Sequence, residues 1–200
     1  MSNRLLMPLI SALLAFAAMG CQLHNRAAEA AFDLPPTPSS STLPYTVSAM
    51  HHQFVGPKNY LYVPAHVSFD DEASSVAPVV AAIKQLTTSG QISAADSMLL
   101  VYHDPSEDPS VPFDLEIGVP LRTVPAHLPD GFQLRTLPAF RCATLLYRGP
   151  LKLLNKAYDK LIREMIDRGL VPSEETRESY LVWDAPDSPK NVVQIEVGIR

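Results

Sequence analysis

Two stretches of the chain alternate strictly between apolar and polar or small residues. In "FDLEIGV" the odd positions from Phe113 to Val119 are apolar, and in "VQIEVGI" the odd positions from Val193 to Ile199 are apolar. A period of two places all apolar side chains of a strand on one side. The pattern therefore predicts two strands of an antiparallel sheet, with one face apolar and ready to be covered.

Helical spacing of apolar residues follows a different period in two other segments. One stripe lies between residues 151 and 168 and is closed by Gly169, which is typical of a helix C-terminus. Its members are Leu151, Leu154, Tyr158, Leu161 and Met165. A comparable stripe in the first half of the chain is formed by Val76, Val79, Val80, Ile83 and Leu86. Pro78 within it predicts a late helix start or a kink.

The same order of segments occurs twice. With Pro57 placed on Pro138, "PKNYLYVPAHVSF" matches "PAFRCATLLYRGP", and "SMLLVYHDP" later matches "ESYLVWDAP". Each copy is predicted as strand, strand, helix, strand, strand, with residues 45–53 and 131–137 as the opening strands. We predict an α+β fold of duplicated β-β-α-β-β units, about 45–120 and 121–200. These form one mainly antiparallel sheet of at most eight strands, with two main helices on one face and a central cleft.

The N-terminus has the composition of an export signal. Arg4 precedes an apolar run of about 14 residues, shorter than the roughly 20 that span a bilayer. Cys21 after small residues resembles the lipobox of bacterial lipoproteins, which implies an acylated Cys21, and Gln22 then favours the outer membrane facing the periplasm. The alternative is an ordinary signal peptide with a coincidental cysteine. We predict a signal peptide at 1–20, a lipidated Cys21 with a Pro- and Ser-rich tether at 21–44, and a folded domain at 45–200.

Charge and cysteine content exclude some classes of function. Arg4 is one of 16 basic residues, so 15 remain outside the signal against 21 acidic ones, a formal charge of −6. An acidic domain is not expected to bind nucleic acid. Cys142 is the single cysteine of the domain and lies in an apolar run, so a buried structural role is expected.

The segments "FDLEIGVPL", "LPAFRCATLLYRGP", "ESYL" and "VQIEVGI" in this order resemble the GyrI-like, or AraC-type effector-binding, domain over roughly residues 45–200. The resemblance implies a cleft between the two units for small apolar or cationic molecules. In that family a Glu at the head of the penultimate strand faces the cleft; here it is Glu178, with Tyr180 on the same strand face. Tyr158 lies on the apolar stripe of the helix, so we expect it mainly to pack in the core and secondarily to line the cleft.

Three residues besides those already named are candidates for contact with a ligand in the cleft. Tyr147, Tyr62 and His66 lie in the paired inner strands and are further candidates for ligand contact. The plainer interpretation of Glu178 is a solvated carboxylate at a strand end.

Two acidic and two aromatic residues of the strands are not expected to contact a ligand. Glu116 and Glu196 alternate with the apolar face, so they are expected to face solvent. Trp183 lies five residues after Glu178 and therefore points to the opposite side of the strand. Tyr102 has the same relation to Ser97 in the first copy, so both aromatic residues are expected to pack in the core or to lie at the rim of the cleft.

Four functions remain open. The first is a lipid-anchored protein that binds a small apolar or cationic molecule; it has no expected cofactor, and no helix-turn-helix segment precedes the domain. The second is a hydrolase of strained electrophiles that uses Glu178 as the catalytic carboxyl with a tyrosine hydroxyl. The third is haem binding of the SOUL type, with His66 as the axial candidate. The fourth is a scaffold whose cleft is filled by its own side chains. His51-His52, His103-Asp104 and Asp70-Asp71-Glu72 lack metal-motif spacing.

Overall fold

The computed structural model describes residues 44–106 and 108–200. The predicted signal peptide, the lipidation site at Cys21 and the tether as far as residue 43 lie outside the described residues. Within the described part of the chain, no helix is both long and apolar enough to cross a membrane.

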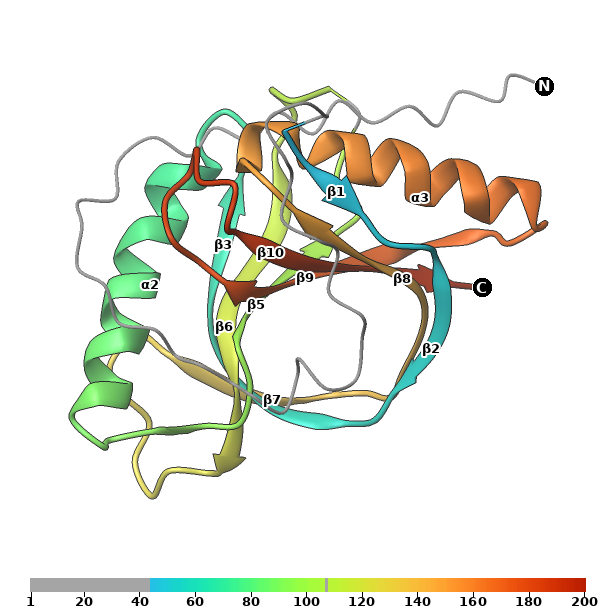
Figure 1. Ribbon diagram of the computed structural model, residues 1–200. Coiled ribbons are helices and arrows are strands. Elements are labelled where there is room, and N and C mark those ends of the chain that lie inside the picture. Colours follow the sequence, from blue (N-terminus) through green and yellow to red (C-terminus); the bar gives the residue numbers. More distant parts are fainter. Residues whose placement is uncertain (1–43, 107) are drawn as a thin grey trace.

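Each half of the domain contains the predicted strand, strand, helix, strand, strand. The first half comprises β2 (His51–Val55), β3 (Lys58–Val67), α2 (Glu72–Thr88), β5 (Met98–His103) and β6 (Phe113–Thr123). The second half comprises β7 (Gln133–Leu137), β8 (Phe140–Arg148), α3 (Asn155–Asp167), β9 (Pro172–Val182) and β10 (Val192–Ile199). A short 3₁₀ turn, η1 (Leu151–Leu153), leads into α3. The duplication predicted from the sequence is therefore confirmed (Figure 1).

All strands belong to one antiparallel sheet in the order β1-β8-β10-β9-β5-β6-β3-β7, with β2 also paired to β8 and β4 to β6. The described residues form ten strands, not the predicted maximum of eight: the opening strand predicted at residues 45–53 is split into β1 (Thr46–Val47) and β2, and β4 (Ser93–Ala94) was not predicted. The opening strand of each half pairs with the other half, since β2 lies on β8 and β7 lies on β3. The halves meet at the centre, where β5 pairs with β9.

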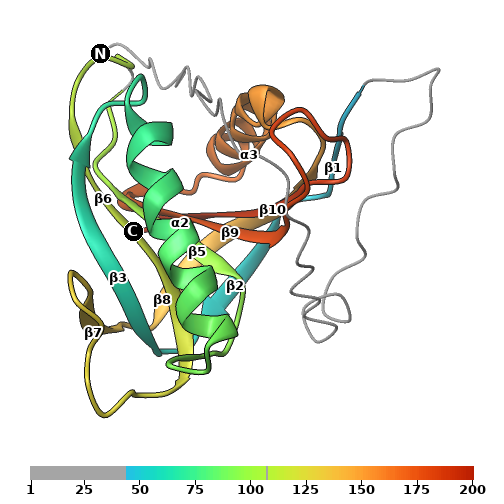
Figure 2. The same cartoon turned by 90° about the vertical axis from the view of Figure 1, so that its left-hand side faces the viewer.

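Both helices cover the same face of the bent sheet. Helix α2 lies over β3 and β6, and α3 lies over β8 (Figures 1 and 2). The apolar face predicted from the alternation is the one they cover: Phe113, Leu115, Ile117, Val193 and Ile195 are all at most 3 % exposed and share one core with Leu161 and Met165. Burying this face is the main source of stability.

Element boundaries differ from the expectation in two places. Helix α2 begins at Glu72 and carries Pro78 in its second turn, so the late start is wrong. Strand β9 begins at Pro172, so Glu178 lies in the middle of a strand and not at its head. β9 is extended because β10 and β5 pair with it on both sides, which a single-sequence pattern of charged residues does not reveal.

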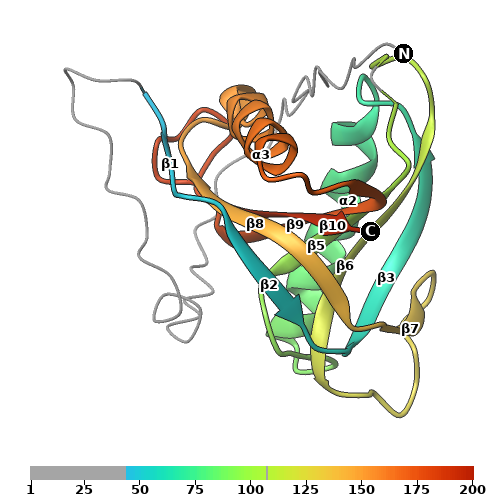
Figure 3. The ribbon, with the colours of Figure 1, turned by 90° about the vertical axis from the view of Figure 1, so that its right-hand side faces the viewer.

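The uncovered face of the sheet is more polar than its opposite, yet several of its side chains are buried. Glu196 is 5 % exposed and the side chain of Glu116 is 14 % exposed, so the prediction that both acids face solvent is wrong. Arg177, the cross-strand partner of Glu196, is 1 % exposed, pairs with Glu175 at 2.6 Å and stacks over Phe140. The strands curve around this face (Figure 3).

Cys142 is a buried free thiol in β8, as expected from its apolar surroundings. Burial raises the pKa of its thiol to about 12. A thiol with so high a pKa is not a nucleophile at neutral pH.

Candidate functional site

Glu178 lies at the centre of the molecule. It occupies the middle of β9, with Leu100 of β5 as its cross-strand partner from the first half and Ile195 of β10 on the other side. Its side chain points to the face that the helices cover, and the residue is 1 % exposed. The interpretation of Glu178 as a solvated carboxylate is therefore wrong.

Three tyrosine hydroxyls donate to this carboxylate. Tyr158 of α3 donates to Oε1 at 2.6 Å, and Tyr180 of β9 donates to Oε2 at 2.8 Å. Tyr102 of β5 lies 3.3 Å from Oε2. A buried charge is costly unless its acceptor positions are filled, and here neutral donors fill them without supplying a counter-charge.

The two effects shift the pKa of Glu178 in opposite directions. Burial raises it, and the hydrogen bonds from Tyr158, Tyr180 and Tyr102 lower it, with burial the larger effect. The pKa values of all three tyrosines are raised, first by their own burial and then by the neighbouring carboxyl groups. The hydroxyls therefore stay protonated and serve as fixed donors.

A second buried carboxyl belongs to the same network. Tyr102 Oη lies 2.7 Å from Oε1 of Glu72, the first residue of α2, which is 7 % exposed. Burial and the charge of Glu178 raise the pKa of Glu72 to about 8, against a lowering effect of Tyr102. The site thus combines two carboxyls and three tyrosines from α2, β5, α3 and β9.

Sequence reasoning missed Glu72 and assigned Tyr102 to packing. The side of the strand on which Tyr102 lies was inferred from its place in the aligned repeat, and not from the neighbouring strand β9. In the structure Leu100 faces Glu178 and Tyr102 faces Thr176, so even positions of β5 and β9 share a face. Pairing β5 with β9 at the junction of the halves would have revealed this; for Glu72 the sequence offered only its place at a helix start.

The other predicted ligand residues are not at this site. Tyr62 and His66 belong to β3 and face the uncovered side of the sheet, where Tyr62 donates to Gln133 and His66 pairs with Asp114. Tyr147 lies on the helix side in the same core cluster as Tyr158, but its hydroxyl donates to the Pro150 carbonyl at 2.6 Å. A single cleft lined by all six candidates is therefore not what the structure contains.

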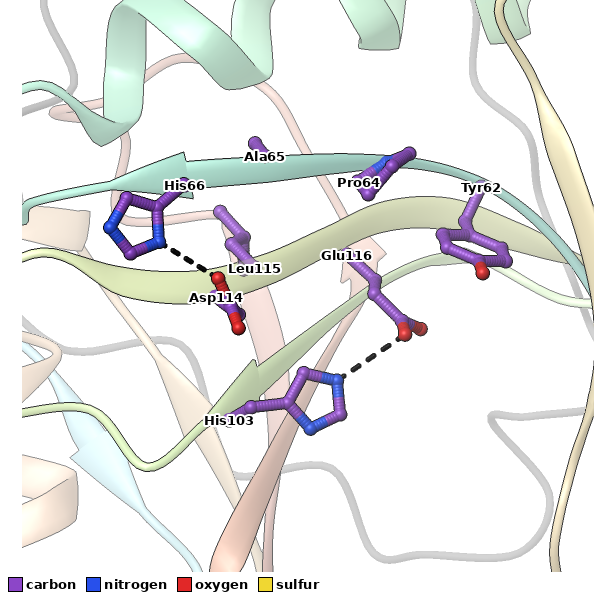
Figure 4. Close-up of a pocket in the computed structure, with 8 residues that line it drawn as sticks. All are labelled: Tyr62, Pro64, Ala65, His66, His103, Asp114, Leu115 and Glu116. Carbon is purple, nitrogen blue, oxygen red and sulfur yellow. Dashed lines mark hydrogen bonds and ion pairs between the residues drawn. The ribbon is translucent and has the colours of Figure 1, made fainter.

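Tyr62 and His66 line a separate, open hollow of about 470 Å³ on the uncovered face (Figure 4). Its polar members include Glu116, which His103 contacts at 3.3 Å and Arg135 at 2.8 Å. His66 itself has a side chain 68 % exposed. Such polar, open surroundings do not favour a haem, for which His66 was the axial candidate.

Among the residues that the structure describes, no three His, Cys, Asp or Glu side chains gather closely enough to hold a metal ion. The Asp70-Asp71-Glu72 run illustrates why. Asp71 accepts a hydrogen bond from Ser68, while Glu72 turns inward to Tyr102.

The chemistry of the site follows from its composition. A carboxylate in a buried apolar setting attracts a cation more strongly than it would in water, because the surroundings screen charge poorly. The tyrosines that contact it have further aromatic neighbours: Trp183 lies edge-on to Tyr180 at 6.1 Å, and Phe69 lies 6.4 Å from Tyr102. Rings in this position also offer cation–π contacts. The site is therefore suited to an apolar cation or to proton transfer.

Solved structures share this fold at low sequence identity. The C-terminal domain of EcmrR aligns at a TM-score of 0.63 and 19 % identity, covering 79 % of this chain and 99 % of that one. In the EcmrR–DNA complex the TM-score is 0.62 and the identity 17 %, and the alignment spans 80 % of this chain and 59 % of the EcmrR chain. SAV2435 bound to tetraphenylphosphonium aligns at 0.56 and 12 %, covering 76 % of this chain and 94 % of that one.

A hydrolase from Listeria innocua aligns at a TM-score of 0.55 and 12 % identity, over 88 % of this chain and 98 % of that one. No curated protein sequence matches the chain. The family model for the GyrI-like small molecule binding domain matches residues 53–200. With that match over most of the chain, the protein belongs to the GyrI-like small molecule binding domain family, as the order of its motifs indicated.

Proposed function

We propose that this protein binds small apolar cations at Glu178. The observation that carries the proposal is a buried carboxylate held by three neutral hydroxyl donors, with no basic side chain among the described residues that contact it. The family description, a small molecule binding domain, supports a small ligand. A protein of the same fold binds tetraphenylphosphonium, a bulky apolar cation of the kind such a site suits.

A cation would supply the positive charge that the described neighbours of Glu178 do not provide. Glu178 has hydrogen-bond donors but no counter-charge, so an arriving cation gains the full attraction of a poorly screened carboxylate. Because Glu178 is only 1 % exposed, a ligand in contact with it has to displace part of what covers it. Rings of Tyr180, Trp183 and Tyr102 would then replace the water around the cation.

Titration of the protein with tetraphenylphosphonium by isothermal calorimetry tests this proposal. Glu178→Gln keeps the shape and removes the charge, so affinity should fall at least tenfold, about 1.4 kcal/mol. Glu174→Gln is the matched control, because Glu174 lies on the same strand with an exposed side chain paired to Arg200. Equal affinity of wild type and Glu178→Gln would contradict the proposal.

The cellular setting is part of the same proposal. We place the protein in the bacterial cell envelope, lipid-anchored through Cys21 on the outer membrane and facing the periplasm, where it would capture compounds that enter the cell. This rests on the resemblance of the N-terminal residues to a lipoprotein signal. Metabolic labelling with a radioactive fatty acid should mark the wild type and not Cys21→Ala; labelling of both would contradict the anchor.

Hydrolysis is the second candidate function, and the raised pKa of Glu178 favours it. A carboxyl with a raised pKa is suited to general acid or base work, and Tyr158 or Tyr180 would donate to the developing charge. A fold relative described as a hydrolase is consistent with this. Turnover of a cyclopropane-bearing electrophile by the wild type and not by Glu178→Gln would establish it, whereas binding without turnover leaves the first function.

A further inference from the structure

Glu72 is a buried acid, and no basic side chain in the described part of the chain pairs with it. It begins α2, where an acidic side chain normally stays in solvent and favours the helix N-terminus. Here the side chain turns inward, and its Oε1 lies 2.7 Å from the hydroxyl of Tyr102. Tyr102 in turn lies 3.3 Å from Glu178.

The two contacts of Tyr102, with Glu72 and with Glu178, are both filled only when the two carboxyls share one proton. Tyr102 has a single hydroxyl hydrogen for two carboxyl neighbours. If both acids are ionised, one of the two contacts lacks a hydrogen. If one acid is protonated, it donates to Tyr102 and Tyr102 donates to the other acid, so every contact is filled and the site holds one negative charge. Tyr158 and Tyr180 also donate to Glu178, whereas Tyr102 is the one described hydroxyl bonded to Glu72, so the charge is favoured on Glu178 and the proton on Glu72.

The electrostatics agree with the hydrogen count. Among the described residues, Glu178 and Tyr102 are the titratable groups that act most on Glu72, and its pKa is raised to about 8. Tyr158 of α3 and Tyr180 of β9 face the same pair, and their pKa values are raised by both carboxyls. No cationic side chain of the described residues acts on Glu72, and the hydrogen bond from Tyr102 is the one effect that favours its ionised form, so a cationic ligand would bring the first positive charge beside it.

We propose that Glu72 is a second carboxyl of the ligand site, which admits doubly charged cations by releasing a proton and so widens the ligand class beyond single cations. This rests on the proposed cation site at Glu178. A single cation neutralises Glu178 and leaves Glu72 protonated. A compact dication brings a second positive charge near Glu72, which gives its proton to the buffer and becomes the second carboxylate.

Two aromatic probes of similar size separate these cases: 1-methyl-4-phenylpyridinium carries one charge, and 1,1′-dimethyl-4,4′-bipyridinium carries two. Calorimetry of the full-length chain in two buffers of different ionisation enthalpy gives the number of protons released on binding. The dication should release about one proton at pH 7, and its Kd should fall about tenfold per pH unit up to about pH 8. The single cation should release almost none and show little change over the same range.

Glu72→Gln is the diagnostic variant. It should lose both the proton release and the pH-dependent gain in affinity for the dication, and its circular dichroism spectrum shows whether it is folded. The role of Glu72 would be overturned if both probes released the same number of protons from the wild type, or if proton release persisted in Glu72→Gln. The comparison of the two probes with the wild type remains valid even if the variant fails to fold. If neither probe binds the wild type, the cation site at Glu178 fails and this inference with it.

Discussion

Tyr102 and Glu178 belong to different halves of the repeat and meet across the centre of the sheet, with Tyr102 Oη 3.3 Å from Glu178 Oε2. The contact exists because β5 and β9 are the strands at which the halves join. Each half alone supplies only part of the site: the first contributes Glu72 and Tyr102, and the second contributes Glu178, Tyr158 and Tyr180. The duplication therefore creates the polar network at its own junction.

Tyr158→Phe should weaken tetraphenylphosphonium binding about tenfold, roughly 1.4 kcal/mol. Tyr158 makes the shortest contact with Glu178, and its hydrogen bond lowers the pKa of that carboxyl. Without it the ionised form of Glu178 is less favoured, so a cation meets a weaker charge. Calorimetry at pH 7.5 measures the change.

Tyr62→Phe is the matched control for that experiment. Its hydroxyl bonds to Gln133 on the opposite face of the sheet, so affinity should stay within about twofold of wild type. An equal loss in both variants would mean that the two faces share one ligand site.

The amino-acid pattern predicted the fold better than it predicted the site. Alternation and helical spacing are local, and they located the strands, both helices and the apolar face. The contacts of Glu178 depend instead on which strands become neighbours. The inward direction of Glu178 was predicted from the resemblance to the family. The place of Tyr102 at the site could be predicted only from the register between β5 and β9. The burial of Glu196 needed the curvature of the whole sheet, which is not encoded in any short segment.

Stability without ligand should decrease as the pH rises from about 4.5 to about 8. The pKa of Glu72 is about 8 in the folded chain and near 4.5 when the chain unfolds. Between these values the folded state binds more protons than the unfolded state, so the free energy of unfolding falls with pH. The loss is of the order of a few kcal/mol. Chemical denaturation between pH 5 and 9 measures it.

Glu72→Gln provides the comparison for the pH series, because a glutamine cannot ionise. Its free energy of unfolding should fall less steeply over the same range, leaving the contribution of Glu178, whose raised pKa acts with the same sign. A slope unchanged in Glu72→Gln would show that another group binds the proton.

Arg177→Ala should lower the free energy of unfolding by about 3–5 kcal/mol. The guanidinium is fully buried, lies 3.9 Å over the Phe140 ring and pairs with Glu175. Its removal takes away the largest effect that lowers the pKa of the buried cross-strand Glu196 against the effect of burial. Urea unfolding at pH 7 measures the loss. Arg200→Ala breaks the exposed pair with Glu174 and should cost under about 1 kcal/mol, so similar losses would refute the distinction.

Trp183 should report ligand binding directly. It is the only tryptophan in the sequence, and its ring lies edge-on to Tyr180 at 6.1 Å. Because the hydroxyl of Tyr180 donates to Glu178 at 2.8 Å, a cation that displaces Tyr180 from the carboxylate also changes the surroundings of the indole. Titration with tetraphenylphosphonium should therefore shift or quench the tryptophan emission with the same Kd as calorimetry. Trp183→Phe should abolish the signal while calorimetric binding persists, and Glu178→Gln should weaken both together. Emission that stays constant while calorimetry detects binding would place the ligand elsewhere on the protein, with the hollow around Tyr62 and Glu116 as the next surface to test.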